Sequence, residues 1–279
     1  MSPQAEGAVG NEAAVAEVAA PGGGASPWTP WVFRIGSVGL VLLIWELYGR
    51  AQETTLFFVP FSSVVGALWD LAGTSEFWNA FGQTFIPFIW GWLLSLAVGI
   101  LLGLLIGRFR TFDALTKPYV TFLNALPVST LVPIAVILFG IGYASRILVV
   151  FLFGVVEVTL NTAAGVRYVS RDLVEMGESF NAKQTRLFRK VILPASLPGI
   201  MAGIRIGTGR AVVGMVVVEI LLVAVGMGRL ILRYRGRFQS AELYAVVLAL
   251  IIFGILLQVI ARRFEHRVSR WKYEMEKVA

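Results

Sequence analysis

The longest uncharged stretch of the chain limits what this sequence can fold into more than any other feature. It runs from Phe77 to Gly107 and contains no Asp, Glu, Lys or Arg. A helix of about 20 apolar residues is long enough to cross the hydrocarbon core of a bilayer. The whole chain is similarly apolar, because 57% of its residues are hydrophobic and only 15% are charged, against about 25% charged residues in a soluble domain. We therefore expect an integral membrane protein.

Six segments are apolar and long enough to predict membrane-spanning helices. The first is the weakest, because Arg34 stands at its start and Glu46 near its end. The expected fold is therefore all-α, with about six transmembrane helices. The six segments are Trp31–Tyr48, a span within Phe77–Gly107, a span within Pro118–Ser145, Ile147–Val166, a span within Ala195–Met227, and Leu243–Ala261.

Residues 1–30 differ in composition from the rest of the chain. They are rich in Ala, Gly and Pro, and they contain three glutamates but no Lys or Arg. Such a segment buries too little apolar surface to offset its ordering entropy, so we predict a disordered tail. It also has no basic region before an apolar core, so no secretory signal peptide is expected. Residues 31–279 then form one membrane domain.

The basic residues of the loops predict the orientation of the spans. With the N-terminus inside, most loop and C-terminal Lys and Arg lie on the cytoplasmic side, as the positive-inside rule requires. Both termini are therefore expected in the cytoplasm, and the net charge of +7 needs no nucleic acid to explain it. Four arginines before the sixth segment fall outside instead. They are either interfacial arginines touching lipid phosphates, or a docking or guiding patch for an acidic partner or an anionic solute: Arg229, Arg233, Arg235 and Arg237.

Several chemistries are excluded by residue types that the chain lacks. There is no cysteine, and His266 is the single histidine, so thiolate or multi-histidine metal sites cannot form. We expect His266 in a solvated tail. The sequence has no G-x-x-x-x-G-K-[ST] phosphate loop, so it cannot be an ATPase of that kind. No metal, cofactor or catalytic residue is predicted in this chain.

The connection at about residues 167–198 has apolar residues at helical spacing, which a simple linker would not need. Val169, Leu173, Met176 and Phe180 share one helical face, and a second apolar face starts at Leu187 and Phe188. Asn181, between them, tolerates the left-handed backbone of a sharp corner. Two short amphipathic helices are therefore predicted outside the membrane. They form either a docking element or a helix pair lying on lipid.

This connection resembles the cytoplasmic EAA loop of the permease subunits of binding-protein-dependent ABC importers. The family pattern is Glu-Ala-Ala, three residues, Gly, nine residues, an aliphatic residue, one residue and Leu-Pro. The chain departs from it at Met176, Gly177 and Asn181, and an asparagine still permits the turn. The matching residues are Glu175, Val191, Leu193 and Pro194.

The resemblance extends over most of the chain, and it is to the nitrate, sulfonate and taurine branch of the family. It implies a type I ABC importer permease fold, a homodimer, two cytoplasmic ABC ATPase subunits that bind ATP and Mg, and an external solute-binding protein. The residues that carry it include Leu126-Pro127, Pro133, Phe139 to Gly142, Asn161-Thr162, Gly165-Val166, Leu193 to Pro198, Gly203 to Arg205, Gly209 to Ala211, Glu219 and Gly226 to Gly228.

The resemblance also implies where the ATPase would dock. The expected coupling residues lie on both predicted helices of the loop and at its corner. They are Glu175, Met176, Gly177, Phe180, Asn181, Leu187, Phe188, Leu193 and Pro194.

Polar residues within the predicted spans are candidates for the translocation pathway. Prolines break the third segment, which is either a kinked packing helix or a helix lining the pathway. Charges inside a span are costly and are usually paired or in contact with water. Glu157 is therefore either paired with Arg205 or Arg210 or protonated, and Glu219 is either paired with one of these arginines or part of the pathway. The candidates are Asn124, Pro127, Ser129, Thr130, Glu157, Asn161, Arg205, Arg210 and Glu219.

The function expected from this sequence is that of a transmembrane permease subunit of an ATP-driven importer in a bacterial cytoplasmic membrane. It would move a small anionic solute inward by alternating access. The alternatives are a secondary transporter driven by an ion gradient, which usually shows repeated halves, and a membrane enzyme or scaffold.

Overall fold

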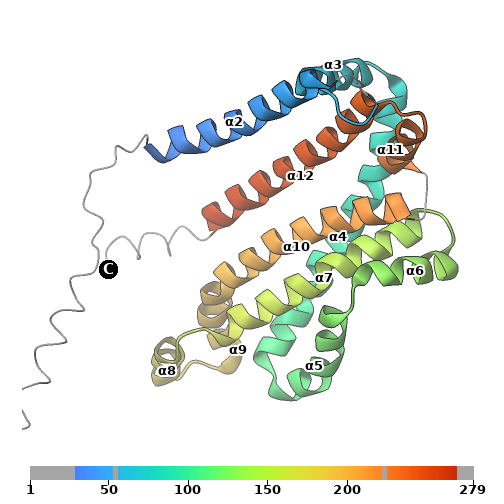
Figure 1. Cartoon of the computed structure of the whole chain (residues 1–279). Helices are drawn as coiled ribbons and strands as arrows, with labels where there is room; N and C mark the ends of the chain where they lie inside the picture. Colours follow the sequence, from blue (N-terminus) through green and yellow to red (C-terminus); the bar gives the residue numbers. More distant parts are fainter. Residues whose placement is uncertain (1–28, 53–55, 222–224, 269–279) are drawn as a thin grey trace, which may run out of the picture.

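The computed structural model describes residues 29–52, 56–221 and 225–268, and these are helical almost throughout, with no β-strand among them. Three long helices, α4, α7 and α10, pack side by side, α12 runs alongside α10, and α2 lies farther from them (Figure 1). The helices are α2 (Thr29–Ala51), α3 (Phe61–Ala72), α4 (Ser75–Arg108), α5 (Arg110–Ala125), α6 (Val132–Phe139), α7 (Tyr143–Arg167), α8 (Arg171–Ser179), α9 (Gln184–Leu187), α10 (Leu193–Leu221), α11 (Gly226–Gly236) and α12 (Ser240–Val268).

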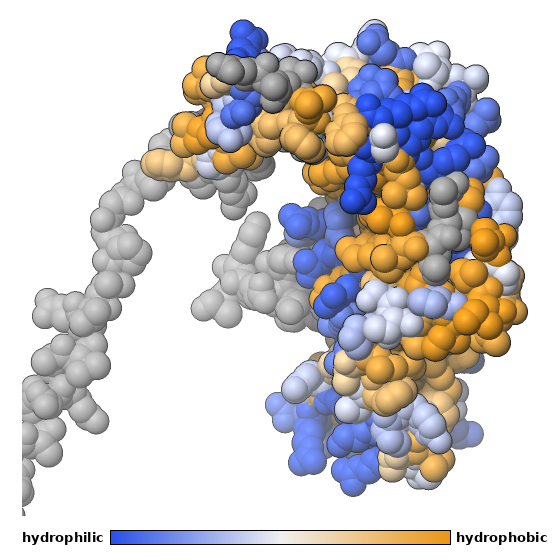
Figure 2. Space-filling model, turned by 45° about the vertical axis from the view of Figure 1, so that its right-hand side comes forward, coloured by the Kyte–Doolittle hydropathy of each residue, from blue (hydrophilic) through white to orange (hydrophobic). Residues whose placement is uncertain are grey.

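The described residues supply candidates for most of the predicted spans. Among the described residues, α4, α7 and α12 are each long and apolar enough to cross a membrane, and two bent helix pairs raise the number to five. The helix predicted as the first span, α2, has 23 residues and carries Glu46 and Arg50 in its last two turns. Hydrophobic residues cover much of the middle of the face in Figure 2, and hydrophilic residues gather toward its upper and lower ends.

Small residues allow α4 and α7 to pack very closely. Gly91, Ser95, Gly99, Gly103 and Gly107 repeat every four residues along α4, which places them on one face of the helix. A Cβ atom added to Gly103 would lie 2.5 Å from Cβ of Thr162 on α7. Because apolar burial does not drive association between helices in lipid, close backbone packing of this kind contributes much of the stability.

The third predicted span is broken into two helices, as its prolines indicated. The helix α5 ends at Ala125, a 3₁₀ turn follows at Val128–Leu131, and α6 leaves at 93° to α5. Leu126 is extended because the residue before a proline is disfavoured in helical conformation. Pro133 lies in the first turn of α6, where its missing N–H costs nothing.

The predicted corner of the connecting loop is confirmed, but the second short helix is not separate. Asn181 has φ of +53°, in the left-handed region. From Gln184 the chain then stays helical through α9, a π-helical turn at Phe188–Ile192, and α10. Pro194 and Pro198 therefore lie within this helix instead of preceding it.

Two predictions at the chain ends have different outcomes. The predicted tail, residues 1–30, lies outside the described residues except for its last two, which begin α2. His266, expected in a tail, lies in the last turn of α12.

Candidate functional site

A pocket of about 340 Å³ lies where the turn after α5 meets α7 and α10. It brings together five of the predicted pathway residues: Asn124, Pro127, Ser129, Glu157 and Arg210. We call it the Arg210 pocket. The break after α5 forms one wall, because Leu126, Pro127 and the 3₁₀ turn all line it.

The charged centre of the Arg210 pocket is an ion pair between α7 and α10. Arg210 Nε lies 3.1 Å from Oε1 of Glu157. The Arg210 side chain is 61% exposed and that of Glu157 21%. A guanidinium has five N–H donors, so Arg210 keeps donors free for an anion while Glu157 holds its position.

Four other pathway candidates do not line this pocket. Thr130 donates to the carbonyl of Pro127, and Asn161 donates to the carbonyl of Glu157, 2.8 Å away. Arg205 pairs with Glu265 of α12 at 2.9 Å. The structure thus separates the two arginines that the sequence could not distinguish. Glu157 pairs with Arg210, and Arg205 connects α10 to α12.

The fourth of these residues, Glu219, belongs to a buried network whose partners the sequence did not predict. Its carboxylate accepts from the Thr84 hydroxyl at 2.8 Å and from the Gly228 N–H at 3.0 Å, and Arg146 Nη1 lies 3.7 Å away. The expected pairing with Arg205 or Arg210 is therefore wrong. Glu219 is 1% exposed, and it connects α10 to α4, α7 and α11.

Arg146 falls between the third and fourth predicted spans, yet the structure buries it. It donates to the backbone carbonyls of Gln83 at 2.7 Å and Gly142 at 3.1 Å, and its guanidinium lies over the Tyr143 ring. The only sequence signal for this burial is that Arg146 stands at the very start of an apolar segment. Charged residues within spans usually face the protein interior and pair with an opposite charge.

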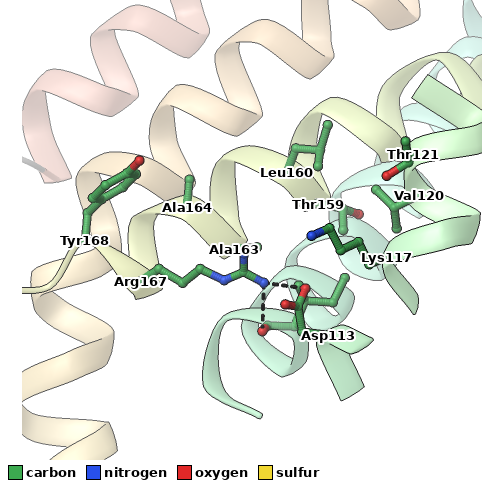
Figure 3. Close-up of a pocket in the computed structure, with 11 residues that line it drawn as sticks. Asp113, Lys117, Val120, Thr121, Thr159, Leu160, Ala163, Ala164, Arg167 and Tyr168 are labelled. Carbon is green, nitrogen blue, oxygen red and sulfur yellow. Dashed lines mark hydrogen bonds and ion pairs between the residues drawn. The ribbon is translucent and has the colours of Figure 1, made fainter. Parts of the chain in front are cut away.

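A second pocket, of about 460 Å³, lies between α5 and α7 nearer to the C-terminus of α7. Figure 3 shows Arg167 of α7 directed at Asp113 of α5, with which it forms an ion pair, and Lys117 beside them. We call this the Lys117 pocket. The third predicted span lies within Pro118–Ser145, so Asp113 and Lys117 fall in the loop before it, whereas the structure places both on α5.

The Lys117 pocket and the Arg210 pocket lie one after the other between α5 and α7. The Lys117 pocket uses Val120 and Thr121 of α5 and Thr159 and Leu160 of α7. The Arg210 pocket continues with the next turns of both helices, at residues 123–124 and 156–157. No residue of α5, which contributes to both pockets, is buried.

The helices α8 and α9 of the connecting loop lie at the end of the molecule opposite α11 (Figure 1). Gly177 allows α8 to pack on α9, since a Cβ there would lie 2.5 Å from Cδ1 of Leu187, which is 1% exposed. On the outer side, Leu173, Met176 and Phe180 are exposed, Phe180 by 82%. Glu175 is exposed beside them. An apolar face left open on a short helix suits a protein partner.

The predicted arginine patch is only partly free. Arg233 forms an ion pair with Glu76 at the start of α4, and Arg229 lies 3.9 Å from the same carboxylate. Glu76, which lies 157 residues before Arg233 in the sequence, therefore neutralises part of the patch. Arg235 and Arg237 are exposed. Arg237 directly follows the last residue of α11, whereas Arg229 and Arg233 lie within the helix.

Comparisons with known proteins point to one family of transport proteins. The family model described as "Binding-protein-dependent transport system inner membrane component" matches residues 95–270. A putative aliphatic sulfonates transport permease protein of Bacillus subtilis is 26% identical over 88% of this chain and 90% of its own length. The taurine transport system permease protein of Escherichia coli is 26% identical over 87% of this chain and 90% of its own length.

The fold is also found among solved structures. An inward-facing structure of the MetNI methionine ABC transporter contains a chain that aligns with a TM-score of 0.52 at 20% identity. The alignment covers 73% of this chain and 98% of that one. The resemblance inferred from the loop residues is therefore confirmed. The chain belongs to the family of inner membrane components of binding-protein-dependent transport systems, as a permease subunit in the branch of the sulfonate and taurine permeases.

Proposed function

We propose that this permease moves a small anionic solute inward by alternating access, along the side of α7 that carries the Arg210 and Lys117 pockets. The observation that carries the proposal is the convergence of Arg210 with Asn124 and Ser129 in the Arg210 pocket. An arginine, an amide and a hydroxyl together supply the donors that a sulfonate or carboxylate accepts.

The charge along this route supports an anion over a cation. The two pockets contain three cationic side chains, Lys117, Arg167 and Arg210, against the two acids Asp113 and Glu157. No ion pair of Lys117 is found among the described residues. The named relatives serve aliphatic sulfonates and taurine, which carry a negative sulfonate group.

Energy would come from two cytoplasmic ABC ATPase subunits that bind ATP and Mg. The exposed face of α8, with Glu175 beside it, is the surface that we assign to them. This chain has no phosphate loop of its own, which supports a non-enzymatic role. Both termini then lie in the cytoplasm.

A second copy of this chain would complete the pathway, with the axis of the homodimer next to the open side of α5 and α6. Ile134, Ile137 and Leu138 of α6 are exposed, as expected for a surface that faces either lipid or another subunit. At the opposite end, Arg235 and Arg237 would contact an external solute-binding protein or guide the anion, because their charge is not neutralised by Glu76.

The test is reconstitution of this chain in proteoliposomes with its ATPase subunits and the binding protein. A thermal-shift screen of the binding protein against nitrate, sulfonates, taurine and aromatic acids would first identify the solute. We expect uptake that requires ATP and the binding protein and that falls in Arg210→Gln. Uptake driven by an ion gradient without ATP would instead support the secondary-transporter alternative, and a cationic solute would overturn the assigned role of Arg210.

A further inference from the structure

A third pocket, of about 420 Å³, lies between the C-terminal end of α4 and the start of α9. We call it the Arg108 groove. Neither the transport pathway nor the exposed face of α8 accounts for it. It is lined by Leu101, Leu104, Leu105, Arg108, Phe109, Gln184, Thr185 and Phe188.

The polar and apolar residues of this groove are separated along the helix axis. Leu101, Leu104, Leu105 and Arg108 are spaced three, four and seven apart, so they form one stripe on α4. The stripe is about 10 Å long at 1.5 Å per residue. The leucines lie nearer the middle of α4. Arg108 is in the last turn, and Gln184 and Thr185 line the same end of the groove. The groove therefore has an apolar floor and a cationic, hydrogen-bonding end.

Arg108 contributes a positive charge that no described carboxylate neutralises. Its guanidinium donates to Oε1 of Gln184 and lies 5.7 Å from the centroid of the Phe109 ring. None of the ion pairs among the described residues includes it. The groove thus offers a cation that could bind an anionic head group and an apolar surface that could bind a hydrocarbon chain. These are the two parts of an anionic amphiphile.

We propose that the Arg108 groove binds an anionic phospholipid. The phosphate would accept hydrogen bonds from the Arg108 guanidinium and the Thr185 hydroxyl, and an acyl chain would lie over Leu101, Leu105 and Phe188. Basic pockets between helices at a membrane surface bind anionic head groups in this way. Leu101 is 59% exposed, so the apolar end of the groove is open to the bilayer.

This lipid would also connect two parts of the molecule. The groove has α4 on one side and α9 on the other, and the bond between Arg108 and Gln184 already joins them. A bound phospholipid would hold the start of α9, and with it Leu187 beneath α8, against the end of the span. Lipid binding itself does not depend on the proposed transport function. Only an effect on ATPase coupling would rest on it.

The test uses the full chain in nanodiscs of phosphatidylcholine with or without phosphatidylglycerol, followed by native mass spectrometry of the lipids retained after extraction. We expect wild type to retain phosphatidylglycerol in preference. Arg108→Gln should reduce that preference about fivefold, the effect of one basic residue at a membrane surface. Arg110→Gln is the matched control, since Arg110 is exposed two residues away and does not line the groove.

Two further variants separate lipid binding from a purely structural role of Arg108. Arg108→Lys keeps the charge and should keep most of the preference, even if the bond to Gln184 weakens. Leu104→Trp keeps the charge but fills the groove, so it should reduce retention of both lipids. Equal retention of the two lipids by wild type would overturn the proposal, as would equal losses in Arg108→Gln and Arg110→Gln.

Discussion

Arg146 of α7 and Glu219 of α10 lie 3.7 Å apart inside the protein, with side chains only 4% and 2% exposed. The Thr84 hydroxyl and the Gly228 N–H donate hydrogen bonds to the Glu219 carboxylate. Four helices, α4, α7, α10 and α11, therefore meet at one carboxylate. Neither residue lines the Arg210 pocket, and the network joins α10 and α11 to α4.

Removing one partner of this buried pair should be strongly destabilising, because the other charge is left without compensation. We expect Arg146→Met to reduce the free energy of unfolding by about 3 kcal/mol. Arg205→Gln is the control, since its pair with Glu265 is partly exposed and should contribute about 1 kcal/mol or less. Thermal unfolding in detergent measures both, and similar losses in the two variants would argue against the buried network.

The glycine face of α4 predicts a sharp contrast between two identical substitutions in one helix. Gly103→Ala places a methyl group 2.5 Å from Cβ of Thr162, so α4 and α7 must separate and the protein should lose stability. Gly82→Ala has nothing within 4 Å of the added Cβ and should be neutral or stabilising by up to about 1 kcal/mol. Thermal unfolding of the two variants tests this, and equal melting temperatures would contradict the close packing.

The ion pair between Glu157 and Arg210 predicts a measurable coupling energy. Because Arg210 is largely exposed, we expect the double-mutant cycle of Glu157→Gln and Arg210→Gln to give only about 0.5–1 kcal/mol. The matching cycle of Glu157→Gln with Arg205→Gln should be additive, since Arg205 contacts Glu265 instead. A larger coupling to Arg205 than to Arg210 would show that the pairing is wrong.

The docking role of α8 predicts that Glu175→Arg folds normally but no longer couples to ATP hydrolysis. The side chain is exposed, so reversing its charge costs little stability but disrupts a fitted interface. Copurification of the ATPase and solute-stimulated ATP hydrolysis are the measurements. Asp70→Arg on exposed α3, at the opposite end of the molecule, is the control and should leave both at wild-type values.

The external role of α11 predicts that Arg235 and Arg237 matter for transport more than Arg233, which is paired with Glu76. Replacing Arg235 and Arg237 together with Gln should slow initial uptake at low salt, and the difference from wild type should shrink at high salt because exposed charges are screened. Assembly with the ATPase should be unchanged. Equal uptake by the variant and wild type at both salt concentrations would rule out the role, and labelling from the cytoplasmic side would overturn the proposed orientation.

Local features of the structure could be predicted from the sequence because neighbouring residues determine them. The apolar stretches that became α4, α7 and α12 need only their own hydropathy to favour a helix in lipid. The corner at Asn181 needs only a residue that tolerates positive φ. The break near Pro127 was visible as a proline signal, although its 93° bend depends on how α6 packs against α7.

The choice of partners was decided only by the tertiary structure. Glu157, Glu219, Arg146, Arg205 and Arg210 all appear in the sequence as charges at or within spans, and each acid could in principle pair with several arginines. Which pairs form depends on where the helices cross and how far they are rotated about their axes, and the small residues between α4, α7 and α10 set both. Those distances join residues more than fifty positions apart, so the sequence determined the helices and the charges within them, and packing determined which charges meet.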